Sequence, residues 1–118
     1  MDDVLVVLTN VPNLTVAKTV SRYLVGQGMA ACVNIQPGVK SYYHWEGVIR
    51  QANEVTLLVK TTRARYAEVE SAIKALSPYD LPEVIALPVS QGLPAYLEWV
   101  RTETRPSAQD GAPDNIKE

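Results

Sequence analysis

The amino-acid sequence predicts a single α+β domain in which four strands form one sheet and helices cover one face of it. Short runs rich in β-branched residues alternate with stretches whose apolar residues recur at helical spacing. Hydrophobic residues make up 47% of the 118 residues, which suffices for one core of ordinary size. The domain is expected to cover residues 1–104. Residues 105–118, in which Ile116 is the only sizeable apolar side chain, are expected to form a disordered tail.

The first two elements are a strand and a helix. Residues 3–10 (DVLVVLTN) form a short apolar run bounded by polar residues, which is typical of a buried strand. Val16, Val20 and Leu24 then recur at helical spacing until two glycines end the pattern. The sequence therefore predicts a helix over about residues 14–27.

A long hairpin is predicted over about residues 30–61. Its first strand is interrupted by Pro37 and Gly38, which predict a bulge or bend because proline cannot donate to the ladder. Glu46 and Gly47 are expected to form the tight turn. Alternating apolar residues after that turn then predict the returning strand.

The second half of the domain repeats the helix and strand pattern. An apolar stripe predicts an amphipathic helix over residues 63–76, and residues 77–83 with their two prolines predict a loop. Residues 83–92 are expected to form the fourth strand, where Pro88 favours a position at or near a sheet edge. Residues 94–103 are expected to form a short final helix.

The resulting order, β-α-β-β-α-β followed by a helix, is that of a ferredoxin-like sandwich. Both helices of this arrangement cover the same face of the sheet, so the other face is left bare. The hairpin strands are about 15 residues long, where about 5–6 is usual, and they carry apolar groups on both faces. We therefore expect the chain to associate with copies of itself through sheet extension and burial of the open face.

Composition argues against several classes of protein. The formal net charge is −2, with 13 acidic and 11 basic residues, which gives no electrostatic reason to expect nucleic acid or membrane binding. The strand at residues 54–62 also lacks the aromatic residues of an RNA-binding strand. No apolar run approaches the roughly 18 residues of a membrane span. The single cysteine excludes an internal disulfide, and a soluble cytoplasmic protein is expected.

Cys32 and His44 are the only cysteine and the only histidine, and they are the candidate metal ligands. Twelve residues separate them, so an unbroken strand would place them roughly 40 Å apart. Zinc and copper sites normally need three or four ligands, and no CxxC, HxH or HExxH pattern is present. Cys32 is therefore either a packed thiol or a soft-metal ligand, and His44 either an interfacial residue or a ligand.

Lys60 and Glu83 stand at the ends of predicted strands, where a charged side chain needs solvent or a partner. Two interpretations are open: a structural ion pair near an interface, or a ligand cleft lined by Trp45, Lys60, Tyr79 and Glu83. The single imidazole has no serine or cysteine motif around it, and glycine-rich phosphate loops are absent. No catalytic residues are predicted.

Three blocks of the sequence resemble the CutA family of divalent-cation tolerance proteins, over about residues 3–103. The blocks are AACVNIQPGVKSYYHWEG, EVTLLVKTT and SPYDLPEVIALPVSQGLPAYLEWV. This resemblance implies a ferredoxin-like homotrimer in which strands of neighbouring subunits pair. It also implies an architecture similar to that of the PII signalling proteins.

For function, the resemblance implies a non-enzymatic role in tolerance or homeostasis of copper and other divalent metals. This role requires no cofactor and includes weak binding of metal ions. The alternative is a PII-like protein that senses a small molecule in an intersubunit cleft. Two departures from the family pattern count against a tight copper site: Ser77 stands where the family usually has histidine, and Thr9 where some members have cysteine.

Overall fold

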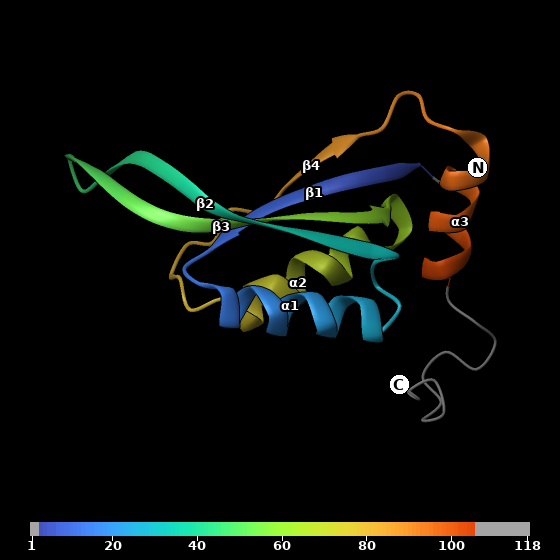
Figure 1. Ribbon diagram of the computed structural model, residues 1–118, viewed down its shortest axis with the longest axis horizontal. Coiled ribbons are helices and arrows are strands. Elements are labelled where there is room, and N and C mark those ends of the chain that lie inside the picture. The colour runs from blue at the N-terminus through green and yellow to red at the C-terminus, as the bar shows by residue number, and fades with distance from the viewer. Residues whose placement is uncertain (1–2, 106–118) are drawn as a thin grey trace.

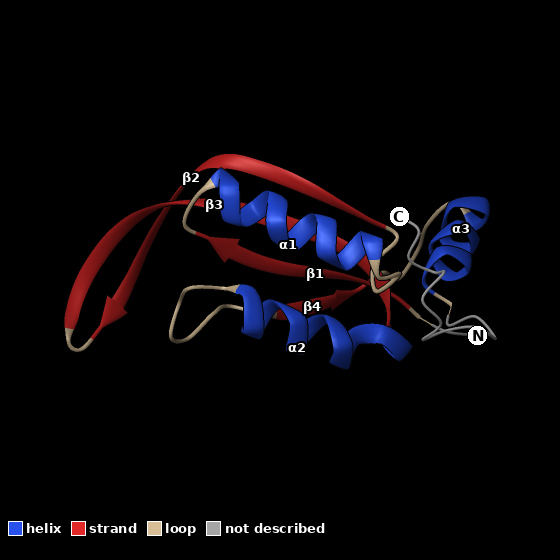
Figure 2. Ribbon diagram, turned by 90° about the horizontal axis from the view of Figure 1, so that it is seen from below, coloured by secondary structure: helices blue, strands red, loops and turns tan. Residues whose placement is uncertain are grey.

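The computed structural model describes residues 3–105 and confirms the predicted α+β fold. Its elements follow the predicted order: β1 (Val4–Val11), α1 (Leu14–Gly26), β2 (Cys32–Trp45), β3 (Val48–Thr62), α2 (Tyr66–Leu76), β4 (Ile85–Pro88) and α3 (Pro94–Thr104). The four strands form one antiparallel sheet in the order β2-β3-β1-β4. Helices α1 and α2 lie side by side on one face, and α3 stands at one end of the sheet (Figures 1 and 2).

Some boundaries differ from those predicted. A short 3₁₀ helix (Arg63–Arg65) precedes α2, and β4 has only four residues. The fourth strand ends earlier than expected because its partner ends there: the Val89 N–H donates to the Val4 carbonyl, where β1 begins. At its other end β4 begins only at Ile85, opposite Leu8, although β1 continues to Val11. All but the first residue of the predicted tail, 105–118, lies outside the described residues. No helix in residues 3–105 is long and apolar enough to cross a membrane.

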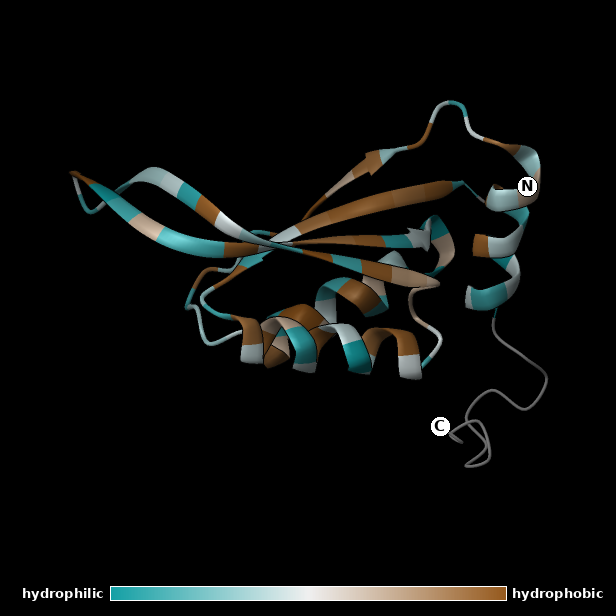
Figure 3. Cartoon of the chain, viewed as in Figure 1, coloured by the Kyte–Doolittle hydropathy of each residue, from teal (hydrophilic) through white to brown (hydrophobic). Residues whose placement is uncertain are grey.

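The core lies between the sheet and the two helices. Alternate residues of β1 and β3 point toward the helices, so Val7, Leu57 and Val59 are completely buried. Leu24 from α1 and Ile73 from α2 complete this cluster from the other side. β1 is hydrophobic along most of its length (Figure 3), as expected for a central strand.

Two polar contacts position the helices. The Asn13 side chain caps α1 by accepting a hydrogen bond of 2.9 Å from the Val16 N–H. The buried guanidinium of Arg65 donates to the Thr104 carbonyl at 3.0 Å and to the Glu68 carboxylate at 2.8 Å. Arg65 therefore ties the end of α3 to the start of α2.

The hairpin of β2 and β3 continues beyond the sheet. Residues 39–45 pair only with residues 48–54, because β1 ends its pairing at Val55, and we call this two-stranded part the arm (Figure 1). The predicted bulge is confirmed by a register shift between Gln36 and Val39. The predicted tight turn is also confirmed, with Glu46 and Gly47 both at positive φ, as a type I′ turn requires.

Helices α1 and α2 leave the opposite face of the sheet uncovered, and α3 packs at one end of that face, where Val100 and Val4 belong to one buried cluster. The side chains of this open face form rows across the strands, and two of the rows are Cys32, Lys60, Val6 and Leu87, and Asn34, Leu58, Leu8 and Ile85. Ile85 and Leu87 are 49% and 51% exposed. The predicted open face is thus present, and it carries apolar side chains next to polar ones.

Shortening Leu57 to alanine is expected to lower the free energy of unfolding by about 2–5 kcal/mol, because the side chain is completely buried and its loss leaves a cavity. The matched control is Leu93→Ala: Leu93 is 71% exposed, and the change should stay within about 0.5 kcal/mol. Urea denaturation at one fixed protein concentration measures both. Equal effects of the two changes would contradict the assigned core.

Candidate functional site

A pocket of about 780 Å³ lies between the arm and the segment that follows α2. The arm contributes residues 41–45 together with Arg50 and Glu54, and the segment contributes residues 78–81 and Glu83. Its volume falls in the range of about 300–1,000 Å³ that is typical of small-molecule sites. The pocket brings together residues that are far apart in the sequence, so it exists only in the folded chain.

The wall after α2 is fixed by hydrogen bonds. The Tyr79 N–H donates to the Ser77 Oγ at 3.2 Å, which turns the chain directly after the helix. The Tyr79 hydroxyl then reaches across to β3 and donates to Glu54 Oε2 at 2.7 Å. This bond connects the loop to the base of the arm.

Asn10, at the end of β1, positions Glu83. Its Nδ2 donates to Glu83 Oε1 at 3.0 Å, while its Oδ1 accepts a hydrogen bond from the Thr56 hydroxyl. Asn10 also lines the pocket. Asn10 was not among the residues predicted to line a site, and the signal in the sequence was a polar side chain at the end of an otherwise apolar strand.

Burial raises the pKa of the Tyr79 hydroxyl well above its usual value of 10. The hydrogen bond to Glu54 raises that pKa further, and so do the charge of the Glu54 carboxylate and the nearby Tyr43. Tyr79 therefore stays neutral over the physiological pH range and remains a hydrogen-bond donor to an ionised carboxylate.

Three of the four predicted cleft residues, Trp45, Tyr79 and Glu83, line this pocket, and Lys60 does not. Lys60 pairs with Cys32 and Val6, six residues along β3 from Glu54, which corresponds to roughly 20 Å of extended strand. Lys60 therefore does not share this pocket within its own chain, and the predicted cleft of all four residues between subunits stays a prediction. Within one chain the Lys60 and Glu83 side chains bind Asn34 and Asn10 rather than each other, and the structural ion pair near an interface stays a prediction.

The two candidate metal ligands lie in different places. His44 is on the exposed arm and lines the pocket, whereas Cys32 begins β2 on the open face of the sheet. Within residues 3–105 no group of three or more His, Cys, Asp or Glu side chains is placed to hold a metal ion. One chain therefore does not bring Cys32 and His44 into a common coordination shell.

Cys32 is half-buried and belongs to a second polar cluster. Its Sγ lies 3.8 Å from the Lys60 ammonium, which also donates to the Asn34 side-chain carbonyl, and 3.5 Å from the Tyr96 hydroxyl. The hydrogen bond with Cys32 is the main reason that the pKa of Tyr96 rises to about 12, and burial and the charge of the thiolate add to it. Cys32 thus has polar partners on the open face.

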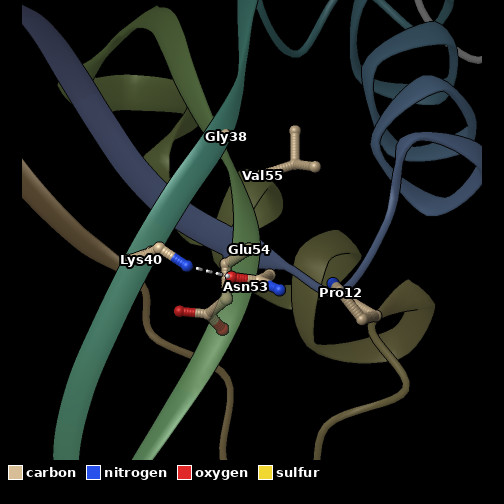
Figure 4. A pocket seen from close by; sticks show the side chains of 6 residues that line it. All are labelled: Pro12, Gly38, Lys40, Asn53, Glu54 and Val55. Atoms are coloured by element: carbon tan, nitrogen blue, oxygen red, sulfur yellow. Dashed lines mark hydrogen bonds between the residues drawn. The ribbon is translucent and has the colours of Figure 1, made fainter.

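A smaller hollow of about 300 Å³ lies at the bulge, next to the base of the arm. The residues that line it are Pro12, Gly38, Lys40, Asn53, Glu54 and Val55 (Figure 4). In that view the Lys40 ammonium points toward the Asn53 carbonyl, to which it donates at 3.4 Å. Glu54 lines both this hollow and the large pocket.

Comparison with known proteins matches the chain to one protein family. A family model described as CutA1 divalent ion tolerance protein matches residues 5–103. The divalent-cation tolerance protein CutA of Thermus thermophilus is 46% identical over 99 residues, which are 84% of this chain and 96% of that protein. The chloroplastic protein CutA of Arabidopsis thaliana is 41% identical over 86% of this chain, which spans only 56% of that relative's length.

Solved structures that are similar to the chain belong to the same family as its sequence relatives. The crystal structure of CutA from Xylella fastidiosa is 43% identical and superposes with a TM-score of 0.85, covering 86% of this chain and 98% of that one. The structure of a periplasmic divalent cation tolerance protein CutA from Archaeoglobus fulgidus is 34% identical, with a TM-score of 0.84 over 86% and 99% of the two chains. The resemblance seen in the sequence is thereby confirmed.

The prediction of a cytoplasmic location is wrong. The relatives include a protein described as chloroplastic and a structure described as periplasmic, so the compartment varies among related proteins. The prediction used the single cysteine and the absence of a long apolar run, and both features are compatible with any of these compartments.

Replacing Cys32 with alanine is expected to lower the pKa of Tyr96 from about 12 toward the ordinary value of 10, because the main hydrogen bond is lost. In the unchanged protein the folded state keeps this proton longer than the unfolded state. The contribution of the Tyr96 hydroxyl to the free energy of unfolding therefore declines as the pH rises from about 10 through 12. Alkaline titration followed by tyrosinate absorbance measures the shift. In a Tyr96→Phe background, Cys32→Ala should leave the titration unchanged, and a shift there would contradict the assignment.

Proposed function

The chain belongs to the CutA1 divalent ion tolerance family, and on this basis we propose that it is a non-enzymatic protein of divalent-cation tolerance. The observation that carries the proposal is the family match over residues 5–103, which includes all of the sheet except Val4 and all of α3 except Thr104. The relatives are named as tolerance proteins rather than as enzymes. This family context supports a role in binding rather than in a chemical reaction.

The proposed metal ligands are Cys32 and His44, acting separately and weakly. A thiolate suits Cu(I), and an imidazole suits Cu(II) and Zn(II). The ammonium of Lys60 lies 3.8 Å from the Cys32 Sγ, and its positive charge repels a metal cation. Each ligand therefore binds an ion with few partners from its own chain, and tight binding is not expected.

Calorimetric titration with Cu(I), Cu(II) and Zn(II) tests this proposal. We expect dissociation constants weaker than about 1 µM, the loss of Cu(I) binding in Cys32→Ala, and the loss of Cu(II) and Zn(II) binding in His44→Ala. Ser71→Ala, an exposed change on α2, is the matched control and should bind all three ions as the unchanged protein does. Absence of heat for every ion would refute metal binding by this chain.

The proposed assembly is a homotrimer. Tyr42 and Ile49 on the arm are 68% and 67% exposed, and the open face adds the apolar side chains of Ile85 and Leu87. A two-stranded ribbon is marginally stable on its own, and clustered exposed apolar groups are typical of interaction surfaces. Neighbouring copies that pack against the arm and the open face would stabilise the two-stranded ribbon and bury the exposed apolar groups.

Light scattering at micromolar concentration is expected to give a mass of three times the 13.0 kDa of one chain. Ile49→Lys should shift the distribution toward smaller species, because it places a charge on the apolar arm. Val25→Lys changes a partly exposed valine on α1, away from the arm, and should leave the mass unaltered. A monomeric unchanged protein would contradict the proposal.

The large pocket supports a second candidate function, the sensing of a small molecule. Trp45, Tyr79 and Glu83 line it together, and its volume is suited to an organic ligand rather than to a bare ion. Binding there would bring the arm and the segment after α2 into contact with one molecule. Such a ligand could thereby couple its own concentration to the position of the arm.

A further inference from the structure

We propose that the pocket between the arm and the segment after α2 binds a small organic cation through its ammonium group. This inference rests on the second candidate function, because it assigns a chemical class to the ligand of that pocket. Three features of the lining support it: aromatic rings, carboxylates without ion-pair partners, and a volume larger than a metal ion needs.

Aromatic side chains are concentrated at the pocket. Tyr42, Tyr43, Trp45 and Tyr79 line it, which is half of the two tryptophans and six tyrosines of the chain. The face of an aromatic ring carries partial negative charge and attracts an ammonium group placed over it. The effect is largest for tryptophan and grows when the site excludes water, so Trp45, which is only partly exposed, is the principal candidate.

Three carboxylates line the same pocket: Glu54, Asp80 and Glu83. Among residues 3–105 none of them forms an ion pair. The neutral donors Tyr79 and Asn10 engage Glu54 Oε2 and Glu83 Oε1 and leave each group its negative charge. The second oxygen of each glutamate therefore remains available to a cationic ligand.

Arg50 is the opposing charge in the lining. It lies on the arm, paired across the hairpin with Tyr43, and it forms no ion pair among the described residues. One guanidinium against three carboxylates leaves the lining with an excess of negative charge, which favours a cation over an anion. Arg50 remains able to contact a polar or negative group elsewhere on the ligand.

A bare divalent ion does not fit the same observations. Such ions need several oxygen or nitrogen atoms that converge within about 2.0–2.6 Å. Residues 3–105 provide no group of three or more acidic, histidine or cysteine side chains so placed. An ammonium group surrounded by methyl or methylene groups instead uses aromatic faces and separated carboxylates, as this pocket offers.

The test is a nuclear magnetic resonance titration of the full chain with tetramethylammonium chloride, observed at the two tryptophan indole N–H signals. Trp45 lines the pocket, and Trp99 lies on α3 at the other end of the sheet, so Trp99 is an internal control (Figure 1). We expect a saturable shift of the Trp45 signal and none of Trp99. Sodium chloride controls for ionic strength, and tert-butanol controls for shape because it is similar in size but neutral.

Two matched variants sharpen the result. Glu83→Gln removes one charge and keeps the shape, and we expect it to weaken tetramethylammonium binding about tenfold. Glu70→Gln removes a charge from the exposed side of α2, outside the pocket, and should leave the affinity unchanged. Glu54→Gln provides a second pocket variant should Glu83→Gln disturb the loop.

Several outcomes would overturn the proposal. One is the absence of a Trp45 shift at concentrations where sodium chloride has no effect. Another is an equal shift with tert-butanol, which would keep the pocket as a small-molecule site but exclude a cationic ligand. Failure here is separate from failure of metal binding, because calorimetry with metal ions depends on Cys32 and His44 and not on Glu83.

Discussion

β3 pairs with β2 along most of its length and with β1 along half of it, and this unequal pairing organises the whole molecule. Where both neighbours are present, alternate side chains of β3 enter the core beneath α1 and α2. Past Val55 one neighbour is missing, and the same strand continues as half of the exposed arm. The core, the open face and the pocket therefore depend on one strand register. A shift of this register by a single residue would move every side chain of β3 to the opposite face of the sheet.

The two polar sites lie at opposite ends of this long hairpin. Cys32, Lys60 and Tyr96 meet where β2 begins, beside α3, whereas Trp45, Tyr79 and Glu83 meet at the arm. A metal ion at Cys32 therefore does not compete with a ligand in the pocket for side chains, whereas a metal ion at His44 does, because His44 lines the pocket. Three strands connect the two regions: β2 and β3 run through both, and β1 carries Asn10 at the pocket and Val6 beside Lys60.

Features set by backbone chemistry were predictable from the sequence. Pro37 and Gly38 predicted the bulge, and Glu46 and Gly47 predicted the turn. Pro88 predicted the edge strand. Each of these residues acts through its own φ angle or its missing N–H. The site was predictable only in part. Whether a side chain at a strand end reaches a given pocket depends on strand length and on the course of the arm, which local patterns do not encode. For that reason Lys60 lies outside the pocket of its own chain, and Asn10 was missed.

The contact between Arg65 and α3 has a practical consequence. The guanidinium binds the main-chain carbonyl of Thr104, while the side chain of Thr104 is itself buried, so the end of the helix is held by both its backbone and its side chain. The end of α3 also lies across the sheet from the arm (Figure 1). Position 105 is consequently a suitable junction for a fluorescent label or surface tether, since a group attached there keeps clear of the pocket.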